Sequence, residues 1–399
     1  MKPALDISNN AATGADALPS RLPHRVGAVL AMIVFPLIWV GGLVTTYDAG
    51  MAVPDWPGTY GYNMFLYPIE TWLFGPFDLL VEHGHRLLGS LAGLVAIVLL
   101  VVTIRKEPRV WVRWFAAGLL VLVICQGLLG GMRVLLAART LAKIHGCVGP
   151  AFFACVVAFC VVTSRWWWEQ GKRKSVSMQG LASTKKGSGL SRLATFLLLA
   201  SFGQLVVGAF LRHISVSSPP NIYRGLVVMH IATAVLLLLG TVTQWTVTRF
   251  GRFKGSGIRG SASVLLALVV VQIGLGFGTW VVKFGWPVWF ADAGFAANFI
   301  VGEKTFLQMN LITAHVAVGS LILAFWTIQV FRCRRLFFAS TADSNLQPRS
   351  KNGIQPISKN YDSEQDDFAP NKDNNKTAQS DSAKKDAEPS PITQHLPSS

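Results

Sequence analysis

The stretch from Glu82 to Arg105 reads EHGHRLLGSLAGLVAIVLLVVTIR, and it carries no charged side chain between Arg86 and Arg105. As a helix that rises about 1.5 Å per residue, it spans most of the roughly 30 Å hydrocarbon core of a membrane. A backbone in lipid must satisfy its hydrogen bonds within its own segment, so a helix is the only stable conformation for such a stretch. The fold class therefore depends on how many stretches of this kind the chain contains.

Seven further uncharged stretches lie between Arg25 and Asp48, Arg113 and Arg133, Lys143 and Arg165, Arg192 and Arg212, Arg224 and Arg249, Arg259 and Lys283, and Lys304 and Arg332. Of the 399 residues, 51% are hydrophobic and only 14% are charged, which is too apolar for an ordinary soluble domain of this size. We therefore predict an all-α, polytopic membrane protein with eight transmembrane helices.

The formal net charge of +16 is explained by membrane orientation rather than by a polyanionic partner. Basic residues concentrate in alternate loops, near Arg105, in the stretch 165–192 and near Arg252, whereas the loop from Asp48 to Glu82 has no Lys or Arg. In membrane proteins, the loops on the cytoplasmic side carry such an excess of Lys and Arg. We therefore predict a multi-pass protein of the cell (plasma) membrane with both termini in the cytoplasm, and no nucleic-acid partner.

The two halves of the chain resemble copies of one unit. Gln-x-x-x-Gly occurs at Gln126, Gln204 and Gln272, and the first span matches this pattern only at Gly42. The repeat predicts two pseudo-symmetric four-helix bundles. The predicted regions are a cytoplasmic N-terminal tail (1–25), the first bundle (26–165), a basic and flexible cytoplasmic linker (166–191), the second bundle (192–332) and a disordered cytoplasmic tail (333–399).

Four histidines lie in the even-numbered spans, one in each, near the outer face: His85, His145, His230 and His315. The residue four positions later is Gly89, Gly149, Ala234 and Gly319, respectively. A residue at this spacing shares the histidine's helix face, and a small one leaves room for a porphyrin. We therefore interpret the four histidines as axial ligands of two bis-imidazole hemes, one in each bundle. The alternative is that they are intramembrane histidines that hydrogen-bond across helices.

One acidic side chain distinguishes the first half from the second. Glu82 lies three residues before His85, whereas Val227 lies three residues before His230. Arg86 can pair with Glu82 in an interfacial ion pair, or it can bind a heme propionate. An acidic group beside only one of two hemes indicates one reactive heme and one helper heme.

The stretch from Glu82 to Gly89 resembles the Glu-x-x-His-Arg-x-x-Gly signature of the heme A synthases, membrane enzymes of bacteria and mitochondria. KIHGCVGP around His145, YRGLVVMHIATA around His230 and LITAHVAVGS around His315 resemble the segments that carry the family's other heme ligands. The resemblance covers about residues 27 to 332.

This resemblance implies a function for each predicted bundle. The second bundle would hold a heme b cofactor between His230 and His315, and the first would receive heme O between His85 and His145. The enzyme would oxidise the C8 methyl of heme O to a formyl group by successive hydroxylations, giving heme A for cytochrome oxidase. Glu82 matches a glutamate that the family uses in this oxidation.

The expected partners are heme O, the lipid bilayer, an unidentified electron acceptor, heme O synthase and cytochrome oxidase assembly factors; a homo-oligomer is also compatible with the sequence. Two other functions use the same histidines. A di-heme b-type electron carrier would need the four ligands but not Glu82. The third alternative is a heme transporter or chaperone, because the consecutive tryptophans Trp166–Trp168 resemble tryptophan-rich motifs of heme-handling proteins.

Overall fold

The computed structural model describes residues 20–173, 185–214, 217–251, 253, 256–290 and 292–337. Within these ranges every regular element is a helix, and eight helices are long and apolar enough to cross a membrane. They are α1 (Leu22–Thr46), α3 (Phe77–Lys106), α4 (Val110–Leu135), α5 (Arg139–Thr163), α7 (Lys185–Arg212), α8 (Pro220–Phe250), α9 (Ile258–Phe284) and α11 (Phe306–Phe337). The predicted all-α membrane fold with eight spans is confirmed.

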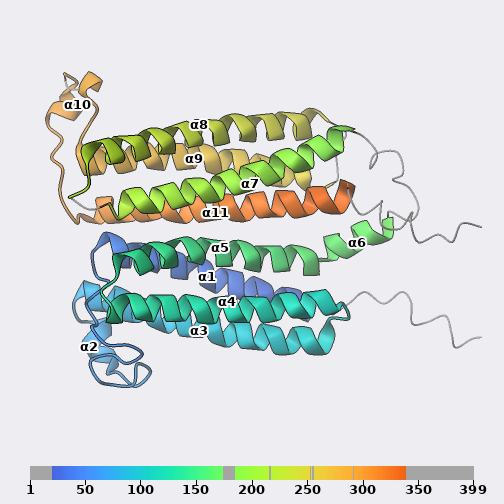
Figure 1. Cartoon of the computed structure of the whole chain (residues 1–399), viewed down its shortest axis with the longest axis horizontal. Coiled ribbons are helices and arrows are strands. Elements are labelled where there is room, and N and C mark those ends of the chain that lie inside the picture. The colour runs from blue at the N-terminus through green and yellow to red at the C-terminus, as the bar shows by residue number, and fades with distance from the viewer. Residues whose placement is uncertain are drawn as a thin grey trace, which may run out of the picture. The chain divides into compact units, whose positions relative to one another are not determined.

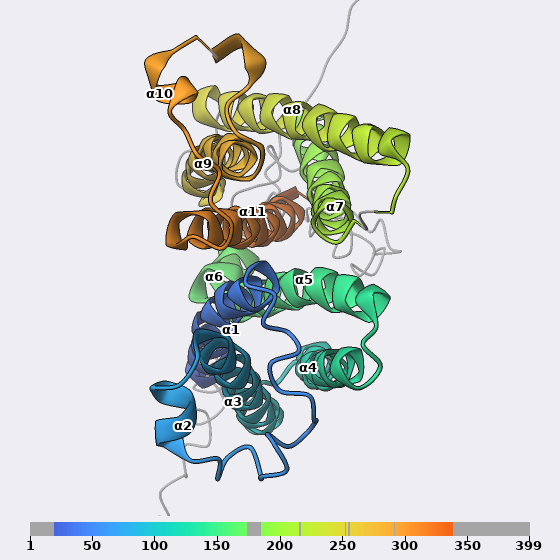
Figure 2. The same cartoon turned by 90° about the vertical axis from the view of Figure 1, so that its left-hand side faces the viewer.

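The eight long helices run side by side and form two groups of four (Figures 1 and 2). The first group contains α1, α3, α4 and α5, and the second contains α7, α8, α9 and α11. Helices α5 and α11 pack against each other where the groups meet, and α1 also contacts α11. The pseudo-symmetry of the two groups stays a prediction.

Helices α3, α5, α8 and α11 all begin at the same end of the molecule. The short helices α2 (Ile69–Leu73) and α10 (Gly294–Ala297), with the 3₁₀ turn Val288–Phe290, lie in the loops at this end (Figure 1). All four candidate histidines lie in the first part of these helices, so we call this the histidine end.

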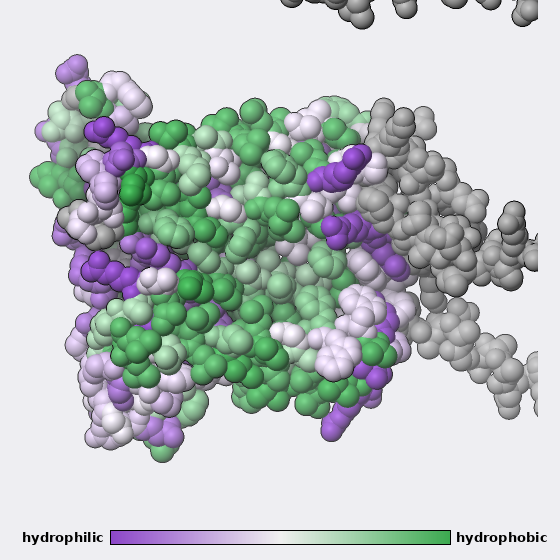
Figure 3. All heavy atoms as spheres, viewed as in Figure 1, coloured by the Kyte–Doolittle hydropathy of each residue, from purple (hydrophilic) through white to green (hydrophobic). Residues whose placement is uncertain are grey.

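The side surface between the two ends is apolar. Leu94, Val121, Leu199 and Leu239 each expose more than half of their surface. Figure 3 shows this hydrophobic band with hydrophilic residues gathered at both ends. Side chains of this kind remain exposed in a membrane protein because lipid, rather than water, surrounds them.

The structure differs from the predicted region boundaries at three places. A helix, α6 (Arg165–Arg173), occupies the start of the predicted flexible linker, and the end of that linker is already part of α7. Helix α11 continues past residue 332, and Cys333 and Leu336 pack in a small buried cluster with Leu190 and Ile258. Residues 1–19, 174–184 and 338–399, where the tails and most of the linker were predicted, lie outside the described residues.

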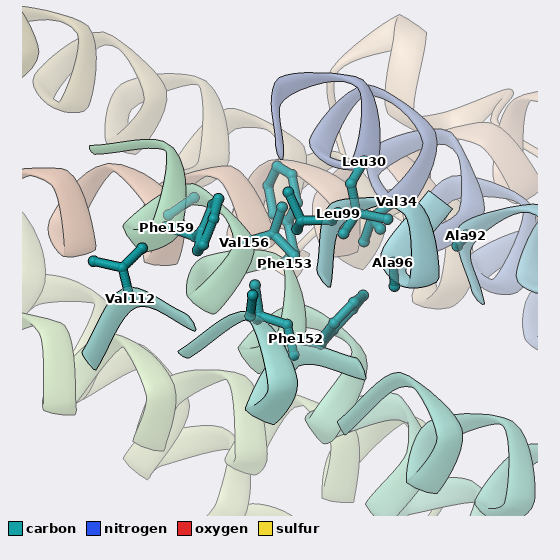
Figure 4. Packing of buried hydrophobic residues seen from close by; sticks show 13 residues of the cluster. Leu30, Val34, Ala92, Ala96, Leu99, Val112, Phe152, Phe153, Val156 and Phe159 are labelled. Carbon is teal, nitrogen blue, oxygen red and sulfur yellow. The ribbon is translucent and has the colours of Figure 1, made fainter. Parts of the chain in front are cut away.

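The core of the first group is built from large side chains of α5 that face α1, α3 and α4 (Figure 4). Phe159 is fully buried, and its ring centre lies 5.7 Å from that of Phe115. A Cβ atom at Gly27 of α1 would lie 3.1 Å from the Phe159 ring, so this glycine allows α1 and α5 to approach closely.

Phe159→Ala should lower the free energy of unfolding by about 3–5 kcal/mol, because it leaves a cavity that its neighbours cannot fill. The measurement is thermal or denaturant unfolding of the purified chain in detergent. Phe196→Ala is the matched control, because Phe196 exposes 51% of its surface and should cost little. Equal destabilisation by the two substitutions would contradict this account of the core.

Candidate functional site

The four candidate histidines form two pairs at the histidine end. The ring centres of His85 and His145 lie 6.3 Å apart, and those of His230 and His315 lie 6.2 Å apart. Two imidazole nitrogens that bind one iron from opposite sides, at about 2.0 Å each, place their ring centres roughly 6 Å apart. Both pairs therefore have the separation that a bis-imidazole heme requires.

No denser cluster of metal-ligating side chains accompanies these pairs. Within the described ranges, His, Cys, Asp and Glu form no group of three that could hold a metal ion. A tetrahedral zinc site needs three or four such ligands. The paired imidazoles therefore fit a porphyrin, which supplies four nitrogen ligands of its own, better than a bare metal ion.

Each imidazole packs against a glycine of the neighbouring odd-numbered span. A Cβ atom on that glycine would lie 2.8–3.4 Å from the ring. The four contacts are His85 with Gly41, His145 with Gly130, His230 with Gly208 and His315 with Gly276. The repeated glycine thus makes room for the imidazole itself. The sequence pattern pointed to Gly42 as the matching residue of the first span, but Gly42 packs against Thr313. The matching residue is Gly41, which packs against His85.

The glutamine of each Gln-x-x-x-Gly pattern holds the backbone of a histidine on the next helix. Its side-chain amide donates a hydrogen bond to the histidine carbonyl oxygen, with N–O distances of 2.7–2.9 Å. The pairs are Gln126 with His145, Gln204 with His230 and Gln272 with His315. These bonds fix the helices relative to each other at the depth of the histidines.

The glycines that follow two of the histidines accommodate these glutamines. A Cβ atom at Gly149 would lie 3.2 Å from the Gln126 amide nitrogen, and one at Gly319 would lie 3.3 Å from that of Gln272. We had attributed these small residues to a flat porphyrin, but the structure gives them a contact within the protein. Gly89 differs, because no such neighbour lies within 4 Å of it.

A ring hydrogen bond sets the chemical form of His145. Its Nδ1 lies 3.1 Å from the backbone oxygen of Gln126, and a carbonyl oxygen can only accept. The proton is therefore on Nδ1, and the lone pair of Nε2 is free to bind a metal. Metal-ligating histidines commonly donate their other ring N–H to a backbone carbonyl oxygen, which orients the ring.

Glu82 and Arg86 form a buried ion pair that also holds the loop between α1 and α3 (residues 47–76), which the sequence predicts to be the first outer loop. The carboxylate exposes 2% of its surface, accepts from Arg86 at 3.0 Å, and accepts from the Val53 amide at 2.9 Å. Arg86 further donates to three loop carbonyls, those of Val53, Asp55 and Gly58. Of the two roles considered for Arg86, the structure shows pairing with Glu82.

The loop is further ordered by its own polar and aromatic contacts. The Asp55 carboxylate accepts hydrogen bonds from the amides of Tyr60 and Gly61. Burial raises the pKa of Asp55, but the backbone hydrogen bonds and the nearby positive charge of Arg86 together hold it below its usual value. The Trp56 ring lies against Gly131, where a Cβ atom would be only 2.3 Å away. The loop therefore closes over the end of α4.

His83 belongs to this loop contact and not to the paired histidines. It is 1% exposed, its Nδ1 lies 3.1 Å from the Thr59 hydroxyl, and its ring contacts those of Tyr67 and Trp72. These contacts show that His83 helps to hold the loop between α1 and α3.

The consecutive tryptophans Trp166, Trp167 and Trp168 lie in α6, at the end opposite to the histidines (Figure 1). Each stacks on an arginine, with the guanidinium carbon 4.3–5.4 Å from the ring centre: Trp166 on Arg332, Trp167 on Arg335 and Trp168 on Arg109. Arg109 lies in the connection between α3 and α4 of the first group, whereas the other two arginines belong to α11. The tryptophans thus connect the groups through cation–π contacts.

The chain matches the model of the cytochrome oxidase assembly protein family over residues 24–219. It is 24% identical over 321 residues to a heme A synthase of Symbiobacterium thermophilum, a match that covers 76% of this chain and 91% of the relative. It is 22% identical over 263 residues to a heme A synthase of Shouchella clausii, covering 61% of this chain and 82% of the relative. With its eight apolar helices the chain is a multi-pass membrane protein, and it is similar to the cytochrome oxidase assembly proteins and to heme A synthases.

Proposed function

We propose that this protein is a heme A synthase that oxidises the C8 methyl of heme O to a formyl group by successive hydroxylations. The proposal rests on one observation: the rings of His85 and His145, and those of His230 and His315, are separated as in a bis-imidazole heme. Two curated relatives that bear the name heme A synthase support it. The product, heme A, would serve cytochrome oxidase.

The two helix groups have different tasks in this proposal. His230 and His315 hold a heme b, which supplies one-electron transfer when bound. His85 and His145 hold the substrate heme O. The asymmetry of charge supports this order, because Glu82 and Arg86 lie beside His85 whereas the position three residues before His230 is Val227.

Glu82 has two tasks beside the first pair. Its two oxygens hold Arg86 and the Val53 amide, and so keep the loop closed over the first group. We propose that it also accepts a proton during the oxidation, for which one of these bonds must open. Exclusion of water by the loop strengthens the electrostatic effect of the ionised carboxylate near the substrate.

The distribution of basic residues supports an orientation in the plasma membrane. The loops at the end opposite to the histidines carry the clusters of Lys and Arg, so this end and both termini would face the cytoplasm. Heme O then lies toward the outer face, and heme O synthase and cytochrome oxidase assembly factors are the expected partners.

The identity of the extracted heme tests the proposed reaction. Protein co-produced with a source of heme O should yield heme B together with heme O or heme A, resolved by chromatography and mass spectrometry. Protein made without that source should yield heme B alone. If heme B is the only heme in both preparations, the protein is a di-heme electron carrier and the proposal is wrong.

Replacing one histidine of each pair tests the assignment of the two sites. His315→Ala should remove the heme b, and His145→Ala should remove heme O or heme A, so each should roughly halve the heme bound per chain. Absorption spectra and extraction measure both effects. Arg224→Ala in α8 is a control, because Arg224 is exposed and should leave the heme content unchanged. Full heme content in either histidine variant would contradict the ligand assignment.

Glu82→Gln separates the charge of Glu82 from its hold on the loop. The amide oxygen of the glutamine can still accept from Val53, so both hemes should stay bound. Heme A formation should fall by about 10²–10⁴-fold, because the proton acceptor is lost. Exposed Glu70 in α2 provides the control Glu70→Gln. Unchanged heme A formation in the Glu82 variant would exclude the proton-transfer role.

A further inference from the structure

Arg133 is a half-buried cation without a partner in the described part of the chain. It lies on α4, three residues after Gly130, the glycine against which His145 packs. Residues at this spacing share a helix face, so Arg133 lies on the side of the histidine site.

The surroundings of Arg133 offer no counter-charge within bonding distance. Its guanidinium packs against Gly50 of the first outer loop, where a Cβ atom would lie 2.7 Å from Nη1. No hydrogen bond or ion pair joins it to another described residue. Glu82 is close enough to act on it electrostatically, but both Glu82 oxygens already bind Arg86 and Val53. A charge removed from water without a partner is costly, so an anion is expected here.

Other cations increase this need for an anion. Lys143 at the start of α5 lies 5.1 Å from the ring centre of Phe210, two residues before Arg212 at the end of α7. The charges of Lys143, Arg212 and Arg133 all act on His213, just beyond α7. Burial, together with these three positive charges, lowers the pKa of His213 to about 4, so its imidazole is neutral near pH 7. We call the three cations, Arg133, Lys143 and Arg212, the basic cluster.

Arg212 connects the basic cluster to the first group of helices. Its guanidinium donates to the Gly42 carbonyl at 2.7 Å and to the Thr46 hydroxyl, both on α1. It thus comes from the second group but is held by the first. The cluster therefore gathers at the histidine end where the two groups meet.

A heme carries two propionate carboxylates, and carboxylates are the anions that arginine and lysine bind most strongly in proteins. Arg86, which we had considered for this contact, is committed to Glu82 and three loop carbonyls. In the second group the residue three positions after Gly276 is Thr279, which is uncharged. A position equivalent to Arg133 is thus charged only beside the first pair.

We propose that Arg133, together with Lys143 and Arg212, binds the propionate carboxylates of the heme held between His85 and His145. This proposal rests on the proposed function, since it requires a heme in the first group. It assigns the recognition of substrate carboxylates to Arg133 and leaves Arg86 as the residue that positions the loop.

Titration of the full chain in detergent with heme B and with heme B dimethyl ester tests the proposal. The ester keeps the iron and the ring but lacks the two negative charges. Uptake by the first group is the part of the titration that His145→Ala removes. The unmodified chain should bind heme B in this group about tenfold more tightly than the ester, or more.

Arg133→Gln should weaken heme B binding in the first group by about tenfold and should remove the preference for heme B over the ester. Arg133→Lys should restore part of that preference, because it keeps the charge. Arg139→Gln is the matched control, since Arg139 is exposed at the start of α5 and should change nothing. Heme uptake by the second group shows in each variant that the chain has folded.

The outcomes separate this proposal from the proposed function. Equal affinity of the unmodified chain for heme B and its ester would overturn the role of the basic cluster and leave the proposed function intact. The same result follows if Arg133→Gln weakens both ligands equally, since Arg133 would then be structural. If His145→Ala removes no uptake, the first group binds no heme, and both proposals are wrong.

Discussion

The packing of a histidine ring against a glycine of the next helix is the contact on which both sites depend. A side chain at that glycine would occupy the space of the imidazole, and the helices would have to separate. The contact also faces each ring toward its partner ring, at 6.3 Å in the first group and 6.2 Å in the second. The glutamine one turn before three of these glycines then fixes the histidine backbone, so the separation of the rings is set by helix packing.

The second constraint is the ion pair of Glu82 and Arg86. In lipid or in a closed site, an ion pair is stable only when the remaining hydrogen-bond donors and acceptors of both side chains also have partners. Here the first outer loop satisfies them, through the Val53 amide and three carbonyl oxygens. The loop in turn depends on the pair, since these bonds and the Trp56 contact with Gly131 hold it over α4. Loop order and the charge beside His85 are therefore coupled.

The number of spans could be predicted from the sequence because a charged side chain is costly in the hydrocarbon core, so each span appears as a long stretch without charges. The sequence also identified the four histidines, because they recur at matching positions of repeated helices. The partner of Arg86 could not be chosen from the spacing, because Glu82 at i−4 and a ligand at the helix end are equally within reach. The role of the glutamines was missed although their pattern was recognised, since only the structure shows that Gln126 reaches the carbonyl of a histidine 19 residues later. The isolated charge of Arg133 could not be predicted either, because a lack of partners is visible only in three dimensions.

The two groups share their histidine contacts and differ at the positions around them. In the first group Leu37 stands one turn before Gly41, where the other three patterns have a glutamine, so the backbone of His85 lacks the amide bond that holds the other histidines. Helix α3, which carries His85, also carries Glu82 and Arg86, and these two residues bind the loop between α1 and α3. A cofactor that stays in place is best served by rigid ligands, whereas a substrate must enter and leave. Under the proposed function, this difference agrees with an exchanged heme in the first group, which has Leu37 and the added charges, and with a resident heme in the second group, which has two glutamines.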